Sequence, residues 1–320
     1  MSVPLIGYHA SHEQWAPGVL LQSVQHAEQA GFGAAMCSDH FAPWSERQGH
    51  SGHAWAWLGA ALATTSLPFG VVTAPGQRHH PAMTAQAIAT LAEMFPGRFW
   101  AALGSGENMN EHITGDPWPP KPERNARLVE SAEVIRSLLA GDEVSHHGHV
   151  RVDRARVWSL PVVAPQLFVA AVSPATSAAM AGWADGLITI DCPHTADTVQ
   201  AFRECGGAGK PVFLQTHVAW ADDDATAVEI AFDQWRNGLV APDEAWDLAM
   251  PDDFDEATAS ATPADIHSCV KVSADLGRHV GWLEELAELS PAGIFVHHVG
   301  HDQHRFIDVF GEHVLPRFSA

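Results

Sequence analysis

Basic side chains are scarce in this 320-residue chain. Only 17 lysines and arginines stand against 38 aspartates and glutamates, which gives a formal charge of −21 at pH 7. A surface with such an excess of negative charge repels phosphate backbones and anionic lipid headgroups. The composition therefore argues against nucleic acid and membrane partners, and it leaves a small-molecule substrate as the expected partner.

Cysteines and long apolar runs are lacking as well. The four cysteines, Cys37, Cys192, Cys205 and Cys269, form no C-x-x-C pair, so neither a disulfide framework nor a zinc knuckle is indicated. No uncharged apolar run reaches the length of about 18 residues that a transmembrane helix needs. The first residues have neither the basic start nor the apolar stretch of a signal peptide. We expect a cytoplasmic protein.

Segments typical of strands and helices alternate along most of the chain, and 46% of the residues are apolar, enough for a large core. The expected strands are 4–10, 33–40, 67–74, 98–106, 166–172, 185–190, 210–220 and 293–299. The expected helices are 18–30, 54–65, 81–95, 121–141, 175–184, 195–204, 223–238, 279–289 and 304–315. This order predicts an α/β fold, the (β/α)8 TIM barrel. An open doubly wound sheet is the alternative, but no G-x-G-x-x-G follows the first strand.

Two segments interrupt the alternation. Residues 143–161 alternate polar and apolar around His147 and Gly148, which is typical of a β-hairpin. Residues 240–263 are rich in proline, aspartate and alanine, and we expect them to form an irregular insertion. We predict a single barrel domain over residues 1–320 that carries both excursions.

Chemically active side chains follow two of the expected strands. Asp39, His40 and Trp44 come directly after the second strand in "SDHFAPW", and Glu107 comes after the fourth in "GSGENMNE". A barrel carries its chemistry at these C-terminal strand ends. A histidine that titrates near neutral pH and a carboxylate from another strand can act as a general acid–base pair. The indole of Trp44 could shield a reactive face.

The residues also indicate what carries out the difficult chemical step. No nucleophile motif such as G-x-S-x-G is present, and there is no P-loop. Acid–base groups without a nucleophile or a metal motif favour a bound organic cofactor. The glycines of "GSG" (104–106) would let a flat ring or a phosphate approach the backbone. Asp39 is open to two interpretations, since aspartate also caps turns.

The 21 histidines leave other functions open. A metal-dependent barrel hydrolase would use histidines at strand ends as zinc ligands. The candidate ligands are His9, His40, His297 and His298. Against this alternative, His9 and His12 are not in H-x-H spacing. His79 and His80 are interpreted as loop surface. A barrel that binds a ligand without catalysis is the third alternative.

Several stretches together resemble the luciferase-like superfamily of flavin and deazaflavin enzymes, in particular the branch of F420-dependent glucose-6-phosphate dehydrogenase. They are "ASHEQWAP", "SDHFAPW", "GRFWAALGSGENMNE", "WADGLIT" and "HHVGHDQHRF". The resemblance implies a (β/α)8 barrel with FMN or coenzyme F420 at its mouth. It implies an oxidoreductase that moves a hydride between a small organic substrate and the cofactor ring, and it implies a homodimer. With FMN, a monooxygenase step is open as well.

The resemblance also assigns roles to residues. His40 matches the active-site base, Trp44 the shielding indole and Glu107 the acid near the ring. Glu13 matches a second acidic residue, and Trp44 and Arg305 are expected at the substrate. The expected cofactor contacts are Asp39, Val71, Val72, Thr73, Ala74, Gly106, Glu107, Asn110, Ala170, Ala171, Val172, Ser173 and Pro174.

The same resemblance predicts one backbone feature, and the sequence departs from the family at several positions. Val71–Val72 fall where the family has a non-prolyl cis peptide. The family's Gly-Gly in the fifth strand's loop is Val172–Ser173 here. The two lysines that hold the sugar phosphate fall near Pro193–His194 and His267–Ser268, so both are missing. Arg305, or its neighbour His304, is left for the third phosphate contact. Glucose 6-phosphate is therefore not the expected substrate.

Within the family, the sequence most resembles a subgroup that has reverted from coenzyme F420 to an ordinary flavin such as FMN, and two observations point the same way. The fifth-strand loop is altered, and the protein is strongly acidic. F420 carries an acidic oligoglutamyl tail, which a negative field repels. Both observations favour FMN.

Overall fold

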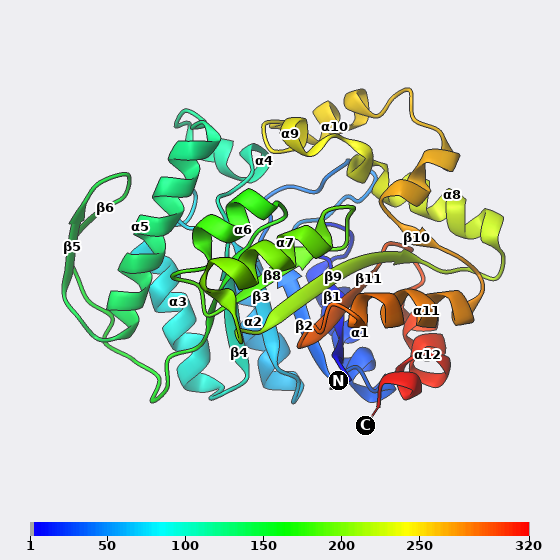
Figure 1. Ribbon diagram of the computed structural model, residues 1–320, viewed down its shortest axis with the longest axis horizontal. Helices are drawn as coiled ribbons and strands as arrows, with labels where there is room; N and C mark the ends of the chain where they lie inside the picture. The colour runs from blue at the N-terminus through cyan, green and yellow to red at the C-terminus, as the bar shows by residue number, and fades with distance from the viewer. Residues whose placement is uncertain (1–2, 320) are drawn as a thin grey trace.

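The computed structural model describes residues 3–319, and a barrel of parallel strands forms its centre (Figure 1). The barrel strands are β1 (Leu5–Ala10), β2 (Ala34–Ser38), β3 (Phe69–Thr73), β4 (Phe99–Leu103), β7 (Leu167–Ala170), β8 (Gly186–Ile190), β9 (Val212–Ala219) and β11 (Gly293–His298). Strand β11 pairs with β1, and β8 pairs with β9, so the sheet closes on itself. The predicted (β/α)8 barrel is confirmed. The short β10 (Lys271–Val272), which the sequence pattern missed, extends one edge beside β9.

Helices follow the strands and cover the outside of the barrel (Figure 1). They are α1 (Pro17–Ala30), α2 (Ala54–Thr64), α3 (Pro81–Met94), α5 (Lys121–Leu139), α6 (Pro174–Met180), α7 (Thr195–Phe202), α8 (Asp224–Trp235), α11 (Leu276–Ala287) and α12 (Gln303–His313). Helix α1 shows why the boundaries were predictable: it starts with Pro17 and ends at Gly31, whose φ of 102° suits only glycine well. Within residues 3–319, no helix has the length and apolar character to cross a membrane.

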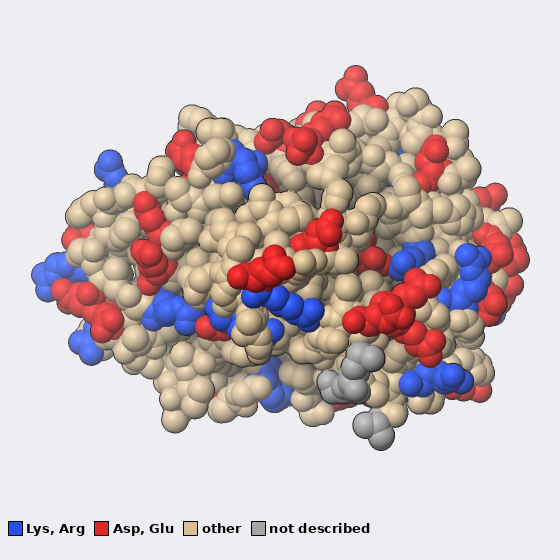
Figure 2. Space-filling view, viewed as in Figure 1, with Lys and Arg blue, Asp and Glu red and all other residues tan. Residues whose placement is uncertain are grey.

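The two excursions differ in detail from the prediction. Strands β5 (Val144–His147) and β6 (Arg151–Ala155) form the expected hairpin beside α5, but it ends at Ala155 rather than at residue 161. Ala155 pairs with Val144, the first residue of β5, so the residues after Ala155 have no partner strand, which explains the early end. The 240–263 segment is not wholly irregular, because it holds α9 (Pro242–Ala245) and α10 (Pro251–Ala257). Figure 2 shows acidic side chains gathered over these two helices.

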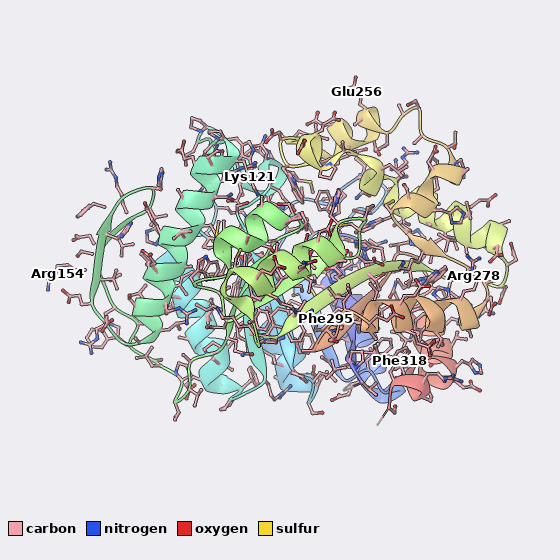
Figure 3. The ribbon with its side chains drawn as sticks, in the orientation of Figure 1. Lys121, Arg154, Glu256, Arg278, Phe295 and Phe318 are labelled. Atoms are coloured by element: carbon pink, nitrogen blue, oxygen red, sulfur yellow. The ribbon has the colours of Figure 1, made fainter. Side chains whose placement is uncertain are left out.

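Aromatic rings fill the middle of the barrel. The Trp100 ring lies 5.1 Å from Phe168, 4.9 Å from Phe213 and 5.8 Å from Phe295, between ring centroids. Phe295, labelled in Figure 3, is 1% exposed. The same interior cluster contains Ala34, Met36, Ala102 and Ile188. The interior is therefore packed below the strand ends, as in other barrels of this kind.

Gly70 on β3 makes room for the central indole. A Cβ at this position would overlap the Trp100 ring, which is held between other rings and has little space to move. We expect Gly70→Ala to lower the free energy of unfolding by about 1–3 kcal/mol, the usual cost of overpacking. Urea denaturation measures this change.

Gly59 in α2 is the matched control, because a Cβ there meets no atom within 4 Å. Alanine favours a helix over glycine by about 1 kcal/mol, so Gly59→Ala should stabilise the protein. Stabilisation by both substitutions would contradict the packing argument.

Candidate active site

Most inward-facing residues at the C-terminal ends of the strands are partly open to solvent. Because side chains alternate along a strand, residues two and four positions after an interior residue also face inward. This rule gives Ser38, Val72, Gly104, Ala170, Ile190 and His217, all partly exposed, whereas His9 of β1 and His297 of β11 are 3% and 1% exposed. Their outward-facing neighbours, such as Val71 and Leu103, are 0% exposed. The barrel therefore has an accessible mouth at this end.

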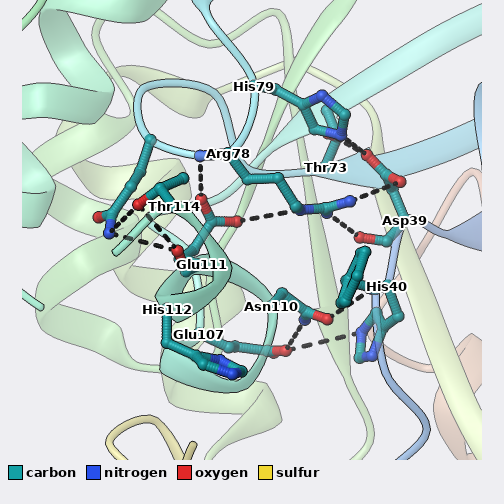
Figure 4. Close-up of polar contacts among 12 residues, drawn as sticks. Asp39, His40, Thr73, Arg78, His79, Glu107, Asn110, Glu111, His112 and Thr114 are labelled. Carbon is teal, nitrogen blue, oxygen red and sulfur yellow. Dashed lines mark hydrogen bonds and ion pairs between the residues drawn. The ribbon is translucent and has the colours of Figure 1, made fainter. Parts of the chain in front are cut away.

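His40 lies between two carboxylates at this mouth. Its Nδ1 is 3.4 Å from Glu13 Oε1. Its Nε2 is 3.6 Å from Glu107 Oε2, a contact that Figure 4 shows. The three side chains come from the loops after β1, β2 and β4, as expected from the sequence. The Trp44 ring lies 4.9 Å from the His40 ring and also packs against Phe254 of α10. An imidazole with a carboxylate at each nitrogen can accept, hold and pass on a proton.

Neighbouring side chains hold both carboxylates in place. Ser11 donates a hydrogen bond of 2.7 Å to Glu13 Oε2. Asn110 donates from Nδ2 to Glu107 Oε2 at 3.0 Å, while its Oδ1 accepts from the backbone N–H of Phe41 at 2.8 Å. Burial raises the pKa of Glu107 above its usual value, although the charge of His40 opposes this effect. The side chain of Asn110 thus positions Glu107, and its contact with a cofactor stays a prediction.

Asp39 lies behind this site rather than in it. Its carboxylate is 0% exposed and contacts His79 Nε2 at 2.7 Å, the Thr73 hydroxyl at 2.9 Å and the Trp55 indole N–H at 3.1 Å. Burial alone would raise the pKa of Asp39, but the hydrogen bond from His79 and the charge of Arg78 hold this pKa well below its usual value. The carboxylate oxygens are thus already in contact with donors of the protein, and the expected contact of Asp39 with a cofactor stays a prediction.

The basic residues around Asp39 were missed from the sequence. Arg78 lies 3.4 Å from Asp39 Oδ1 and donates to the backbone oxygen of Asp39 at 2.6 Å. Glu111 accepts from the Arg78 backbone N–H at 2.7 Å (Figure 4). His79 is also part of this network, so its interpretation as loop surface is wrong. The available signal was "QRHHP", a basic run soon after β3 at the same end of the barrel as Asp39.

The 71–74 segment is regular β-structure up to Thr73. The Val71–Val72 peptide is trans, as are the other peptide bonds within residues 3–319, which corrects the predicted cis bond. Val71 and Val72 pair in register with β2 on one side and β4 on the other, so the ladder is uninterrupted there. Ala74 follows and lies against Gly106, whose φ of 87° favours glycine. The side chain of Thr73 faces Asp39 instead of the mouth.

The segment after β7 borders the mouth next to the end of β4. Ala170, Val172, Ser173 and Pro174 are partly exposed, whereas Ala171 is 4% exposed. The Ser173 hydroxyl caps α6 by accepting from the N–H of Thr176 at 3.3 Å. With Gly104 next to Ala170, this side offers small side chains against which a flat ring can lie.

Arg305 stands apart from the His40 group. It belongs to the first turn of α12 and pairs with Asp222 through both guanidinium Nη atoms. Its side chain is 52% exposed and packs over Trp220. Arg305 is thus paired with an acidic side chain, and its expected contact with a substrate stays a prediction.

The histidines proposed as zinc ligands do not converge. His9 and His297 pack against each other inside the barrel with ring centroids 4.8 Å apart. His298 instead faces outward and stacks on Phe306 of α12 at 4.2 Å. His40 is held by its two glutamates. Across residues 3–319, no three His, Cys, Asp or Glu side chains are arranged to bind a metal ion.

Two related proteins align with almost the whole length of this chain. A glucose-6-phosphate dehydrogenase of Beutenbergia cavernae, named as F420-dependent, is 35% identical over 332 residues and covers 98% of this chain and 97% of that protein. The F420-dependent hydroxymycolic acid dehydrogenase of Mycobacterium tuberculosis is 34% identical over 325 residues, covering 97% of this chain and 87% of that protein.

Solved structures share the fold over the whole chain. A secondary alcohol dehydrogenase, described as F420-dependent and in complex with an F420–acetone adduct, superposes with a TM-score of 0.91 at 29% identity and covers 100% of both chains. The profile of the family described as luciferase-like monooxygenase matches residues 6–290. The chain therefore belongs to the luciferase-like monooxygenase family.

Proposed function

We propose that this protein is an F420-dependent dehydrogenase that oxidises a hydroxyl group of a small organic substrate. The chain is a flavin- or deazaflavin-dependent oxidoreductase, as its family and its full-length dehydrogenase relatives indicate. The observation that carries the finer proposal is the position of His40 between Glu13 and Glu107, beside Trp44, at the barrel mouth. That arrangement suits the removal of a proton from an alcohol.

The relatives favour F420 over FMN. The two dehydrogenases and the alcohol dehydrogenase structure are all described as F420-dependent, so the inclination toward FMN finds no support in them. The small side chains of Gly104 and Ala170 fit a flat ring at the mouth. When bound, a deazaflavin supplies a ring carbon that accepts a hydride.

The overall acidity of the chain does not prevent binding of an acidic cofactor tail, because basic side chains gather locally. Lys121, Arg124 and Arg127 lie along one side of α5. Lys121 Nζ donates to the Ser105 hydroxyl at 2.7 Å, next to the loop that carries Glu107. Arg124 is 4% exposed, and its Nε makes no hydrogen bond to a described residue. Asp247 Oδ1 lies 3.7 Å from Arg124 Nη1, so an acidic cofactor tail would compete with this carboxylate for the cluster.

Each acid–base residue then has a separate task. His40 accepts the proton of the substrate hydroxyl as the hydride leaves the carbon. Glu13 stabilises the charged imidazole that results, because it is fixed by Ser11 at 2.7 Å. Glu107, with its raised pKa, holds a proton more readily than an ordinary glutamate and can serve the ring side of the site. Trp44 excludes water from one face of the reacting group.

Cofactor titration tests this proposal. We expect the purified protein to bind F420 with a micromolar or lower Kd, read from the fluorescence of the deazaflavin, and to bind FMN more weakly. Arg124→Ala should weaken F420 binding at least about tenfold, equivalent to 1.4 kcal/mol. Arg154→Ala is the control, since that arginine is on the hairpin and 76% exposed. Tighter binding of FMN than of F420 would overturn the cofactor assignment.

Some sequence-based expectations remain proposals. We propose a cytoplasmic homodimer with one barrel domain and with no nucleic acid or membrane partner. The strongly negative charge supports the last point. The small-molecule substrate is consistent with the alcohol dehydrogenase relative.

A further inference from the structure

Three imidazoles from three strands meet inside the barrel mouth. The His297 ring of β11 lies 4.8 Å from His9 of β1 and 5.1 Å from His217 of β9. Trp235 of α8 lies 4.6 Å from both His217 and His297, and Trp44 packs against the same apolar cluster as Trp235. The group therefore adjoins the acid–base site without belonging to it.

The direction of the hydrogen bonds in this group is set at Gln14. The Gln14 amide nitrogen donates to the backbone oxygen of Val299 at 2.8 Å and to Gln234 Oε1 at 3.2 Å. A carbonyl oxygen only accepts, so the nitrogen of Gln14 must face it. The Gln14 oxygen then faces His297 Nε2 at 2.8 Å. Nε2 of His297 must therefore carry a proton and donate it.

The same logic continues to His217. Burial lowers the pKa of His297 well below its usual value and lowers the pKa of His217 to about 4, so both rings are neutral at pH 7. A neutral imidazole has one N–H, which leaves His297 Nδ1 as an acceptor. His217 Nδ1, 2.9 Å away, must then donate to it. The remaining nitrogen of His217, Nε2, is left with a lone pair.

This lone pair is available to a ligand. His217 is partly exposed at the mouth, and its Nε2 forms no hydrogen bond with the part of the chain described, residues 3–319. The neighbouring basic group Lys271 is already paired with Asp191 at 3.2 Å. A neutral acceptor without a free cation nearby attracts a hydroxyl or N–H and repels an anion.

We propose that His217 determines substrate specificity by accepting, at Nε2, a hydrogen bond from a second hydroxyl or N–H of the substrate. This inference rests on the proposed function, since it names the class of alcohol that the same site takes. The preferred substrate is a neutral diol or amino alcohol. A substrate with a carboxylate or phosphate at that position is disfavoured.

The tautomer is tested by NMR, independently of activity. Nitrogen-15 labelled histidine reports which ring nitrogens carry protons, and the His217 signals are assigned from their loss in His217→Gln. We expect an Nδ1–H tautomer for His217 and an Nε2–H tautomer for His297. In Gln14→Leu, which removes the acceptor, His217 should become a mixture of tautomers. A proton on His217 Nε2 in the unchanged protein would overturn the inference.

The specificity is tested with matched alcohols. With F420 bound, kcat/KM for cyclohexanediol should exceed that for cyclohexanol about tenfold, the worth of one hydrogen bond to a buried acceptor. Hydroxycyclohexane carboxylate should be the poorest of the three. His217→Leu should abolish the preference for the diol, and His217→Gln, which keeps an acceptor, should retain part of it. His147→Leu on the exposed hairpin is the control.

Failures of the two proposals are distinguishable. Turnover of all three alcohols with the same preference in His217→Leu would overturn this inference and leave the dehydrogenase in place. Lack of F420 binding would overturn the proposed function. In that case, the inference is tested by titrating the protein with cyclohexanediol and following the nitrogen-15 chemical shift of His217 Nε2. A chemical shift that changes and saturates supports the inference, and an unchanged one refutes it.

Discussion

Replacing His40 with alanine is expected to lower kcat for alcohol oxidation roughly 10²–10⁴-fold, the usual contribution of a general base. The imidazole is the group between Glu13 and Glu107, at 3.4 and 3.6 Å, so its removal leaves the alcohol proton without an acceptor in this position. F420 affinity should change little, because the substitution removes no basic side chain of the α5 cluster. Stopped-flow reduction of F420 measures the step directly.

The control for this experiment lies in the same loop. His50 has an exposed side chain, and the structure gives its ring no hydrogen bond within residues 3–319. His50→Ala should keep the kcat of the unchanged enzyme. His40→Asn, which is polar but cannot take up a proton, should be as slow as His40→Ala. An unimpaired kcat in either His40 variant would remove this residue from the mechanism.

Replacing Asp39 with asparagine is expected to lower the free energy of unfolding by about 3–5 kcal/mol, the cost of breaking a buried ion pair. Its carboxylate is 0% exposed and contacts His79 at 2.7 Å and Arg78 at 3.4 Å. The substitution leaves the Arg78 guanidinium, 9% exposed, with Glu111 at 3.6 Å as its remaining carboxylate partner. Because the Asp39 backbone adjoins His40, kcat should also fall. Urea denaturation and kcat are the two measurements.

Asp308 offers a matched control. It contacts His26 at the same distance of 2.7 Å, but its side chain is 67% exposed. Surface ion pairs contribute about 0–1 kcal/mol, so Asp308→Asn should have little effect. Equal losses of stability in the two variants would show that burial is not the cause.

The contribution of Asp39 to the free energy of unfolding should depend on pH in one direction. The pKa of Asp39 is lowered in the folded protein, so its carboxylate stabilises the fold at pH values above the unfolded pKa of about 3.9. The stability is lost as the pH falls below that value toward the folded pKa. The difference between the unchanged protein and Asp39→Asn should therefore be constant near pH 7 and shrink below about pH 4. A difference that grew on acidification would contradict the lowered pKa.

Local sequence patterns were sufficient to predict the architecture. The alternation of strand and helix periods, with stop signals such as Gly31, predicted the barrel and the approximate boundaries of its elements. Once the barrel was assumed, its rule that chemistry lies at C-terminal strand ends brought His40, Trp44 and Glu107 together before any coordinates. Those three side chains are found at one mouth. The hairpin end at residue 161 was wrong, because Ala155 pairs with the first residue of β5, Val144, and the residues beyond it have no partner strand.

The amino-acid sequence by itself determined the fold, the family resemblance and the loops that supply the acid–base groups, because these depend on periods and motifs within short segments. Only the tertiary structure decided which partners each side chain has. It assigned Asp39 to His79 and Arg78, paired Arg305 with Asp222, and set the proton positions from Gln14 to His217. Such contacts join distant parts of the chain, and their geometry follows from packing, for which no local pattern exists.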